Sequence, residues 1–185
     1  DVAVIGAGVV GLATAYALAR RGRRVVMVDR APGPALQTSF ANGAQLSYAY
    51  TDAMAGPALW KQLPGMLAGR DRAFRTRLSA DPDFWRWGLA FLRNATLPRL
   101  QENTLTTLTL ALESRAAMGE LLARHPIEFD QRIAGKLHIY YNAASLPSAQ
   151  AMIERKRPFG VQQRLVDAAE AIAIEPALAG AQGIA

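Results

Sequence analysis

Two short apolar runs near the start of the chain predict two neighbouring strands of a parallel sheet. Each run has four residues and is rich in valine, and the runs span residues 2–5 and 25–28. Between them, alanine recurs at 13, 15, 17 and 19, which predicts a helix with small side chains that can lie close to a sheet. Gly22 marks the end of this helix. The pattern therefore predicts a strand, a helix and a second strand over residues 1–30.

Beyond residue 30 the apolar pattern changes to turn and then to helix. Turn-forming residues at 31–34 precede a stretch of small polar residues at 37–45. From 57 to 125 the spacing of apolar residues is largely helical, and the longest helix is predicted over 100–124. Breaks between helices are predicted near 64–65, 69–70, 81–82 and 98.

One helical segment has a broad apolar arc. Its members are Phe84, Trp85, Trp87, Gly88, Leu89, Phe91, Leu92 and Ala95. Such an arc is typical of a helix that faces the core. The alternative is a surface that faces a membrane or another subunit.

After residue 126 the periodicity changes again. Residues 136–141 alternate like a strand, and residues 161–166 predict another. A helix is predicted between them, from 145 to about 157. Asp167 is the predicted N-cap of a short helix that ends at Glu175-Pro176.

These elements indicate an α/β fold in three parts. We expect a Rossmann-like dinucleotide-binding segment over 1–50, a large helical region over 51–125, and the beginning of a second, α+β domain over 126–185. A parallel sheet needs more than two strands, and no further βαβ unit follows. The chain is therefore expected to be an incomplete part of a two-domain protein.

Composition and charge exclude several classes of site. The 185 residues are 51% hydrophobic, and no apolar run approaches the roughly 20 residues of a membrane-spanning helix. The absence of cysteine excludes disulfides, metal–thiolate sites and thiol catalysis. The net charge of +6 comes mainly from arginine, clustered within 20–24 and 70–77. We interpret these clusters as solvated faces, or as a contact with anionic lipid, rather than as a nucleic-acid site.

The first apolar run is followed at once by a glycine-rich turn, Gly6-Ala7-Gly8-Val9-Val10-Gly11, and the second by Asp29. The first glycine permits a sharp turn, the second lets backbone N–H groups approach a pyrophosphate, and the third lets the helix pack on the strand. The positive end of the helix then points at the phosphates, and Asp29 accepts hydrogen bonds from ribose hydroxyls. The motif predicts a dinucleotide site without choosing between nicotinamide and flavin.

The polar stretch at 37–45 follows the second strand and is expected at the carboxyl edge of the sheet. Ligands bind at this edge in open α/β folds. The alternative is an ordinary surface loop.

The chain resembles the opening of the D-amino-acid-oxidase-like flavoproteins, and within them the bacterial D-amino acid dehydrogenases (small subunit). The resemblance rests on residues 1–29 and on Arg30-Ala31-Pro32-Gly33-Pro34-Ala35-Leu36-Gln37-Thr38-Ser39-Phe40-Ala41-Asn42-Gly43-Ala44-Gln45-Leu46-Ser47. Residues 135–140 and 165–178 are similar to the family's first substrate-domain strand and capped helix. The similarity runs through most of the chain and is strongest over the first 50 residues.

The resemblance implies FAD as the cofactor. Its pyrophosphate would lie over Gly6, Ala7, Gly8, Val9, Val10 and Gly11, and its adenosine ribose on Asp29 with Arg30 beside it. The loop residues that would approach the ribityl chain and the flavin ring are Thr38, Ser39, Asn42, Gly43 and Gln45. Tyr48 and Tyr50 follow this loop directly and are candidate substrate residues, with plain packing as the alternative. Family members more often have Ser-Pro-Gly where this chain has Ser47-Tyr48-Ala49-Tyr50, so the substrate stays open.

The resemblance also implies an activity, in which the α-hydrogen of a D-amino acid leaves as hydride to the flavin N5, giving a 2-oxo acid and ammonia. Electrons would pass to a respiratory acceptor. The expected location is the cytoplasm, with peripheral contact at the inner face of the bacterial inner membrane as the alternative. We assign no catalytic residue and no metal ligand, because neither His125 nor His138 has a required role. The substrate-carboxylate clamp is expected beyond residue 185, and the 185 residues alone are expected to be inactive.

Three other functions stay open. The same family includes enzymes of glycine, sarcosine and cyclic amino acids. Asp29 would also suit the ribose of NAD in an NAD-dependent dehydrogenase. Such a domain should, however, have its third strand within about 30 residues of Asp29, whereas here a helical insert follows. The third alternative is a non-catalytic fragment that binds a dinucleotide without turnover.

Overall fold

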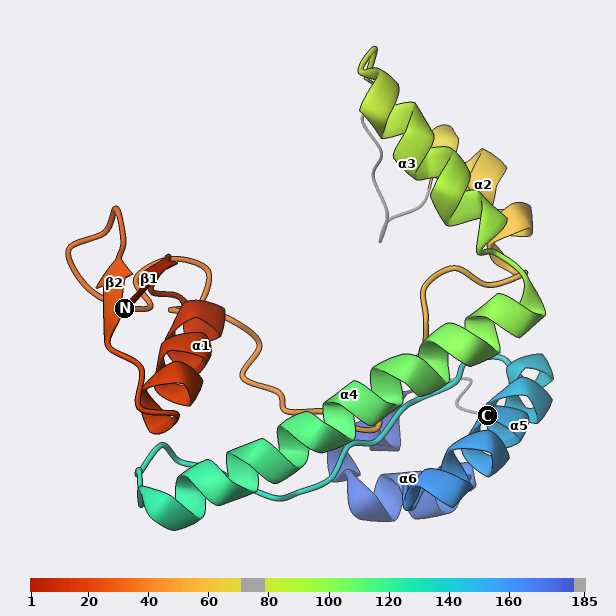
Figure 1. Ribbon diagram of the computed structural model, residues 1–185. Helices are drawn as coiled ribbons and strands as arrows, with labels where there is room; N and C mark the ends of the chain where they lie inside the picture. Colours follow the sequence, from red (N-terminus) through yellow and green to blue (C-terminus); the bar gives the residue numbers. More distant parts are fainter. Residues whose placement is uncertain (71–78, 182–185) are drawn as a thin grey trace. The chain divides into compact units, whose positions relative to one another are not determined.

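The computed structural model describes residues 1–70 and 79–181 and divides into two units, Asp1–Leu46 and Ser47–Ala185 (Figure 1). The first unit contains the small parallel sheet, and the second is mainly helical. This mixture of helices with a small parallel sheet is consistent with a Rossmann-like start.

The first unit is a strand, a helix and a strand. Strand β1 (Val2–Ile5) pairs in parallel with β2 (Val25–Val28), in a register that places Val2 opposite Val25 and Ile5 opposite Val28. Helix α1 (Val9–Arg20) connects them. The predicted bounds of both strands are confirmed.

Helix α1 ends where the sequence predicted. Gly22 has φ +73°, a left-handed conformation that glycine adopts without steric cost. Its N–H donates to the carbonyl oxygen of Ala19 at 2.9 Å, and that of Arg23 donates to Leu18 at 3.1 Å. These bonds satisfy carbonyl groups that the last turn of a helix leaves without partners.

The two strands are half-covered rather than buried. Val2, Val4, Val25 and Met27 lie partly buried, whereas the alternate side chains are exposed, Ile5 with 89% of its surface. Side chains alternate between faces along a strand, and here α1 covers one face only.

The second unit contains five α-helices and three short 3₁₀ turns within the described residues. The helices are α2 (Leu59–Leu67), α3 (Pro82–Arg93), α4 (Leu97–Arg124), α5 (Leu146–Lys156) and α6 (Ala168–Ile174). The turns are η1 (Ala143–Ser145), η2 (Arg157–Phe159) and η3 (Pro176–Gly180). The predicted helices at 100–124, 145–157 and after Asp167 are confirmed.

Side-chain caps and proline set the helix ends. Asp81 accepts a hydrogen bond from the Asp83 N–H at 2.9 Å, and Asp167 accepts one from the Glu170 N–H at 2.8 Å. The break predicted near Pro98 is confirmed, because α3 ends at Arg93 and α4 begins at Leu97. Pro98 stands in the first turn of α4, where proline costs no hydrogen bond. The break predicted at 64–65 is wrong, since α2 continues through Pro64.

A small apolar cluster joins α2 to the end of α3. Leu59, Met66 and Ala95 are buried, and Phe91 and Leu92 pack against them. The apolar arc of α3 is therefore core only in part. Trp85, Trp87 and Leu89 keep 52%, 59% and 57% of their surface exposed.

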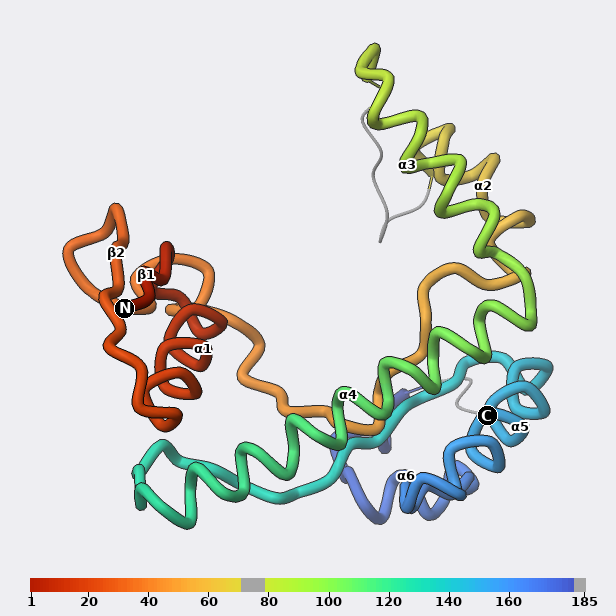
Figure 2. The backbone as a smooth tube through the Cα atoms, viewed as in Figure 1, coloured from red at the N-terminus to blue at the C-terminus, as the bar shows by residue number. Residues whose placement is uncertain are grey.

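Two segments far apart in sequence lie side by side along α4. The chain at 47–56 and the chain at 130–141 both run beside this helix in the tube view, and Tyr50 contacts His138 (Figure 2). Thr104 and Leu108 of α4 have no exposed surface.

The strands predicted at 136–141 and 161–166 are wrong, because neither segment has strand pairing. Alternation of side chains gives an extended chain, but a strand also needs a neighbour for its ladder of hydrogen bonds. In the described residues the only ladder joins β1 to β2.

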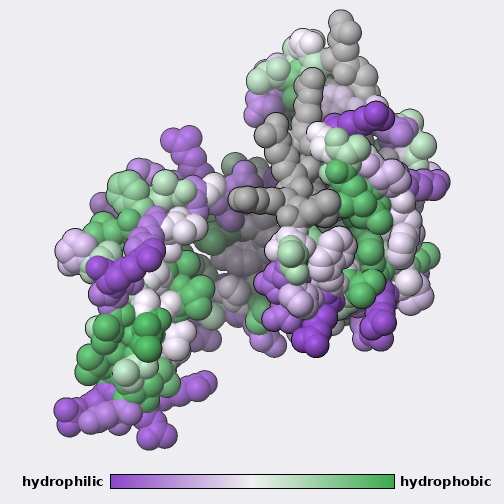
Figure 3. Space-filling view, turned by 90° about the horizontal axis from the view of Figure 1, so that it is seen from above, coloured by the Kyte–Doolittle hydropathy of each residue, from purple (hydrophilic) through white to green (hydrophobic). Residues whose placement is uncertain are grey.

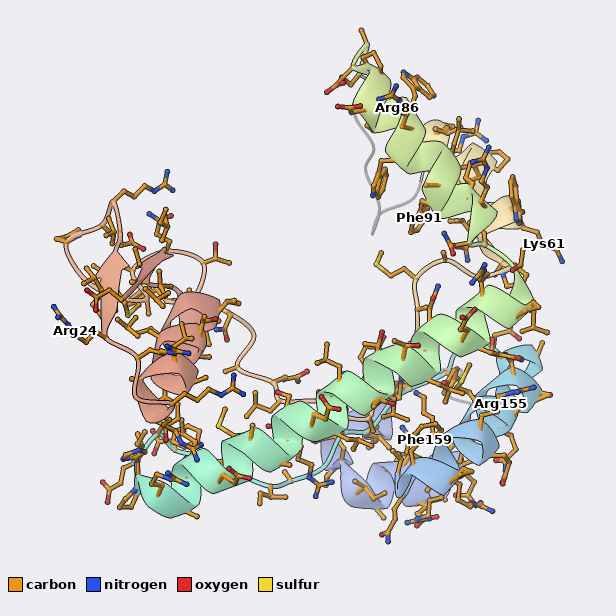
Figure 4. The ribbon with its side chains drawn as sticks, viewed as in Figure 1. Arg24, Lys61, Arg86, Phe91, Arg155 and Phe159 are labelled. Atoms are coloured by element: carbon orange, nitrogen blue, oxygen red, sulfur yellow. The ribbon has the colours of Figure 1, made fainter. Side chains whose placement is uncertain are left out.

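Apolar and charged side chains are mixed over the surface (Figure 3). Arg20, Arg21, Arg23 and Arg24 are exposed, and Figure 4 shows Arg24 just before β2. Of the second basic cluster, Arg72, Arg75 and Arg77 lie outside the described residues. Among the helices that the structure describes, none has the length and apolar character needed to cross a membrane.

Candidate functional site

The glycine turn between β1 and α1 requires glycine at two positions. Gly6 has φ +99°, which other residues rarely adopt. A Cβ atom on Gly11 would lie 1.8 Å from the carbonyl oxygen of Gly6 and 3.6 Å from the Val4 side chain. The helix therefore approaches the strand at a distance that only glycine at position 11 permits.

The start of α1 faces the polar loop. Gly8 is the N-cap and provides no side-chain cap. Instead the Ser39 hydroxyl oxygen accepts a hydrogen bond from the Val9 N–H at 3.0 Å. The first N–H groups of a helix have no partners within the helix, so this end favours anions and acceptors. Ser39 is thus placed at the position where a phosphate group would bind.

Asp29 joins the end of β2 to the glycine turn. Its two carboxylate oxygens accept hydrogen bonds from the Ala7 N–H at 2.6 Å and from the Ala31 N–H at 2.8 Å. The Ala7 bond, followed by the Ala31 bond, lowers the pKa of this carboxyl below its usual value. Asp29 is therefore ionised at neutral pH, and each oxygen keeps acceptor capacity for a further donor.

The polar loop is tied to the turn by further bonds. The Ala35 N–H donates to the carbonyl oxygen of Ala7 at 2.8 Å, and Arg30 donates to the Gln37 side-chain oxygen at 2.6 Å. Asn42 accepts from the Ala44 N–H at 2.7 Å, which shapes the loop locally. These bonds hold the start of the polar loop next to the glycine turn and the end of β2.

A cavity of about 580 Å³ lies at the carboxyl ends of the two strands. This volume is within the range of about 300 to 1,000 Å³ that is usual for small-molecule sites. The lining residues are Ile5, Gly6, Gly8, Val28, Asp29, Arg30, Ala35, Leu36, Gln37, Thr38 and Ser39. Six residues predicted to bind the cofactor therefore meet at one cavity: Gly6, Gly8, Asp29, Arg30, Thr38 and Ser39.

The other predicted cofactor residues lie near this cavity or on the loop beyond it. Ala7, Val9, Val10 and Gly11 belong to the turn and the start of α1. Asn42, Gly43 and Gln45 are exposed and are not among the lining residues. No described contact tests their predicted approach to the flavin.

Sequence reasoning missed the apolar part of the lining. Ile5 and Val28 are the last residues of β1 and β2, and Ala35 and Leu36 follow the turn at 31–34. Ile5 and Val28 could have been predicted to line the cavity, because they end adjacent parallel strands and ligands of such sheets bind at that edge.

The predicted substrate residues belong to the second unit. Tyr48 is partly buried, and Tyr50 is half-exposed. The Tyr50 ring lies edge-on to His138, with 5.0 Å between centroids, and 3.7 Å from the Lys136 ammonium. Tyr50 is therefore held in an aromatic and cationic environment.

The chemistry of the first site fits a dinucleotide. Backbone N–H groups at the start of a helix suit a pyrophosphate, and an ionised carboxylate suits ribose hydroxyls. The backbone of Gly6 leaves no space for a side chain at position 11, so the start of α1 packs directly against the end of β1. The residues present thus fit the adenosine diphosphate part of FAD or NAD.

Comparison with known proteins identifies the relatives. The family model described as FAD dependent oxidoreductase matches residues 1–184. The chain is 44% identical over 184 residues to D-amino acid dehydrogenase 2 of Ralstonia nicotianae, covering 99% of this chain and 43% of that protein. It is 42% identical over 183 residues to D-amino acid dehydrogenase of Paramagnetospirillum magneticum, covering 98% and 43%.

A third relative, D-amino acid dehydrogenase of Rhodopseudomonas palustris, is 36% identical over 181 residues, with the same shares of the two chains. The chain thus spans less than half the length of these curated relatives. No solved structure matches it.

Proposed function

Because this chain belongs to the family of FAD-dependent oxidoreductases, we propose that its first unit binds the adenosine diphosphate part of FAD. The pyrophosphate lies over residues 6–11 at the start of α1, and Asp29 accepts hydrogen bonds from the adenosine ribose. Thr38 and Ser39 line the same cavity and continue toward the ribityl chain. The cavity that joins the glycine turn, Asp29 and Ser39 is the observation that supports this proposal most strongly.

The loop beyond Ser39 approaches the flavin in this proposal. Asn42, Gly43 and Gln45 follow directly in sequence and are exposed, so their polar groups are accessible. Arg30 lines the cavity and is oriented by its hydrogen bond to Gln37, which places its charge near the phosphates and the ribose.

The proposed activity of the whole protein is that of a D-amino acid dehydrogenase. The names of the relatives at 36–44% identity support it. When bound, FAD supplies the hydride acceptor that oxidises the CH–NH bond of the substrate, and hydrolysis of the imino acid gives a 2-oxo acid and ammonia. The residues of this chain contribute the binding and orientation of the cofactor.

We propose that three consecutive parts of the chain have different roles. Residues 1–50 bind FAD, 51–125 form a helical region, and 126–185 begin the substrate domain. Tyr48 and Tyr50 contact the amino acid, and the aromatic and cationic neighbours of Tyr50 support this role.

The electron acceptor is proposed to be a respiratory one, with the protein in the cytoplasm at the inner face of the membrane. Trp85 and Leu89 are exposed one turn apart on the same face of α3, with Arg86 between them in sequence, and they support a peripheral contact with anionic lipid (Figure 4). Sedimentation with phosphatidylglycerol vesicles tests this, with a Trp85→Ser variant as the comparison. Equal sedimentation with phosphatidylcholine vesicles, or no loss in the variant, contradicts it.

The experiment that tests the activity uses the whole protein, purified and supplied with FAD. Oxidised flavin absorption should be present and should bleach when D-alanine is added without oxygen. A colourless protein that does not take up FAD would overturn the proposal. Bleaching by sarcosine or proline derivatives alone would change the substrate, and tight binding of NADH without FAD would favour a nicotinamide enzyme.

A further inference from the structure

The last residue of α5 is a buried lysine. Lys156 keeps only 2% of its surface exposed. Its ammonium donates a hydrogen bond to the carbonyl oxygen of Ala49 at 3.0 Å and lies 2.9 Å from a carboxylate oxygen of Asp52. These partners precede Lys156 by more than a hundred residues in the sequence.

Burial of this charge constrains the chain around it. A lysine is rarely buried without partners, because removing an ammonium from water is costly unless opposite charge and hydrogen bonds replace the water. The Asp52 side chain is 42% exposed, so the pair lies at the edge of the interior. Residues 49 and 52 must therefore stay where Lys156 can reach both.

The segment between these two partners is fixed on a second side by α4. The Ala53 N–H donates to the Thr104 hydroxyl oxygen at 3.0 Å, and the Thr51 hydroxyl donates to the Thr104 carbonyl oxygen at 3.4 Å. Both threonines are buried. Residues 49–53 are thus held at four points, and Tyr50 is the only large side chain among them.

Tyr50 extends from this fixed backbone toward the chain at 136–140. The Lys136 ammonium lies over its ring, His138 meets the ring edge, and His138 stacks on Tyr140 with centroids 5.2 Å apart. Half of the Tyr50 surface stays exposed, so the ring is placed by its neighbours yet accessible.

We propose that Lys156 is a positioning residue for substrate binding. Through Ala49 and Asp52 it fixes the backbone that presents Tyr50, and Tyr50 in turn contributes to binding of the amino acid. The inference rests on the proposed function, because it takes Tyr50 to contact the substrate. Lys156 itself is buried and acts only through this segment.

The test compares two neighbouring substitutions in the whole protein with FAD. Lys156→Met keeps the length and the apolar stem but removes both bonds, whereas Arg155→Met removes an exposed cation from the same turn of α5 (Figure 4). A displaced Tyr50 weakens ground-state and transition-state binding alike, so Lys156→Met should raise KM for the D-amino acid about tenfold with kcat unchanged. Arg155→Met should change neither parameter.

A second readout does not depend on activity. Fluorotyrosine placed at position 50 should give one dispersed fluorine NMR line in the wild type, because Lys136 and His138 surround the ring. In Lys156→Met this line should move toward the position of a solvent-exposed tyrosine, and in Arg155→Met it should stay. If the wild type shows no turnover, the proposed function fails, while the NMR comparison still decides whether Lys156 positions Tyr50.

Asp52→Asn keeps the experiment decisive if Lys156→Met does not fold. It retains a side-chain oxygen and the bond from Lys156 to Ala49, so its effects should be smaller and of the same sign, with KM raised about threefold. An unchanged KM and an unmoved fluorine line in a folded variant overturn the inference. A fall in kcat at constant KM also overturns it, because the effect would then lie in the chemical step.

Discussion

The two units hold their candidate functional residues by different means. In Asp1–Leu46, backbone groups hold the site: the N–H groups of Ala7 and Val9 bind the side chains of Asp29 and Ser39, and the helix packs closely where Gly11 has no side chain. In the second unit, Tyr50 is held through side chains, chiefly those of Lys156 and Thr104. The first site therefore depends on local sequence, and the second on contacts between residues far apart in the chain.

This difference predicts different responses to substitution. A backbone site tolerates changes of side chain except where a Cβ atom occupies required space or where a side chain accepts a backbone N–H. A side-chain site fails when one buried polar partner is removed, because the other partner then loses its hydrogen bond.

The largest effect is expected for Gly11→Ala. The new Cβ would lie 1.8 Å from the Gly6 carbonyl oxygen, so the turn must move away from α1. We expect a loss of about 3 kcal/mol or more in the free energy of unfolding, with loss of bound FAD. Chemical denaturation and the flavin absorption of the purified protein measure both effects.

Gly88→Ala is the matched control for that substitution. Gly88 also lies in a helix, and a Cβ there meets nothing within 4 Å. Alanine should therefore stabilise α3 by about 0.5 to 1 kcal/mol. A similar loss in both variants would mean that helical glycine, and not the close approach of α1 to the turn, explains the effect.

The next effect concerns the second unit. Thr104→Val keeps the shape of a side chain with no exposed surface but leaves the Ala53 N–H without its acceptor. The expected loss in the free energy of unfolding is about 2 kcal/mol. Thr106→Val, which removes only an exposed bond to Glu102 within α4, should cost less than about 0.5 kcal/mol. Equal losses would show that Thr104 does not hold the segment at 49–53.

Asp29→Asn should weaken FAD binding about tenfold, because one backbone N–H loses its acceptor and the ribose loses an ionised partner. Fluorescence titration of the apoprotein with FAD measures this. Asp29→Glu should recover less than full affinity, since its longer side chain cannot reach Ala7 and Ala31 with the same geometry. Unchanged affinity in Asp29→Asn would remove Asp29 from the site.

The same carboxyl predicts a pH dependence of known sign. The pKa of Asp29 is lowered in the folded protein, so its contribution to stability is present above the ordinary value of 3.8 and is lost as pH falls through the lower, folded value. Asp29→Asn should therefore flatten the acid side of the stability profile. If Asp29→Asn has the same stability profile as the wild type, the bonds from the Ala7 and Ala31 N–H groups do not stabilise the ionised carboxylate.

The smallest effect is expected at Tyr140. Burial, then the charge of Asp52 and the neighbouring Tyr50, raises the pKa of its phenol. Asp52→Asn should lower that pKa, and Lys156→Met should raise it, because the Asp52 charge then loses its partner. Alkaline titration of tyrosinate absorbance, with a Tyr140→Phe variant to assign the signal, measures both shifts. If Tyr140 titrates alike in the wild type, Asp52→Asn and Lys156→Met, the charge of Asp52 does not act on Tyr140, and the arrangement of charges around Tyr50 is contradicted.

Most of the first unit could be predicted from the sequence, because its strands, glycine turn and acidic residue lie within one short segment of the chain. Residues 2–5 and 25–28 form strands with the predicted bounds, and the glycine turn, Asp29 and Ser39 meet at one cavity. In the second unit, Asp167 caps its helix as predicted, since a cap also needs only residues three positions apart. The role of Ser39 at the start of α1 was not predicted, because it joins residues thirty positions apart.

The sequence was insufficient for the second unit because pairing and burial there depend on distant residues. Residues 136–141 alternate like a strand, but no neighbour in the described part of the chain completes a ladder. A lysine in the last turn of α5 reads as a solvated cation, and only the positions of Ala49 and Asp52 explain its burial. The same limit applies to α3, where one side of the apolar arc is covered and Trp85 and Trp87 are not.

A crystal structure of the whole protein with FAD tests most directly whether the first unit binds the cofactor. The pyrophosphate should lie over residues 6–11 at the start of α1, with a hydroxyl of the adenosine ribose within hydrogen-bond distance of the Asp29 carboxylate. FAD bound elsewhere, or an adenosine ribose that does not contact Asp29, would contradict the proposed site.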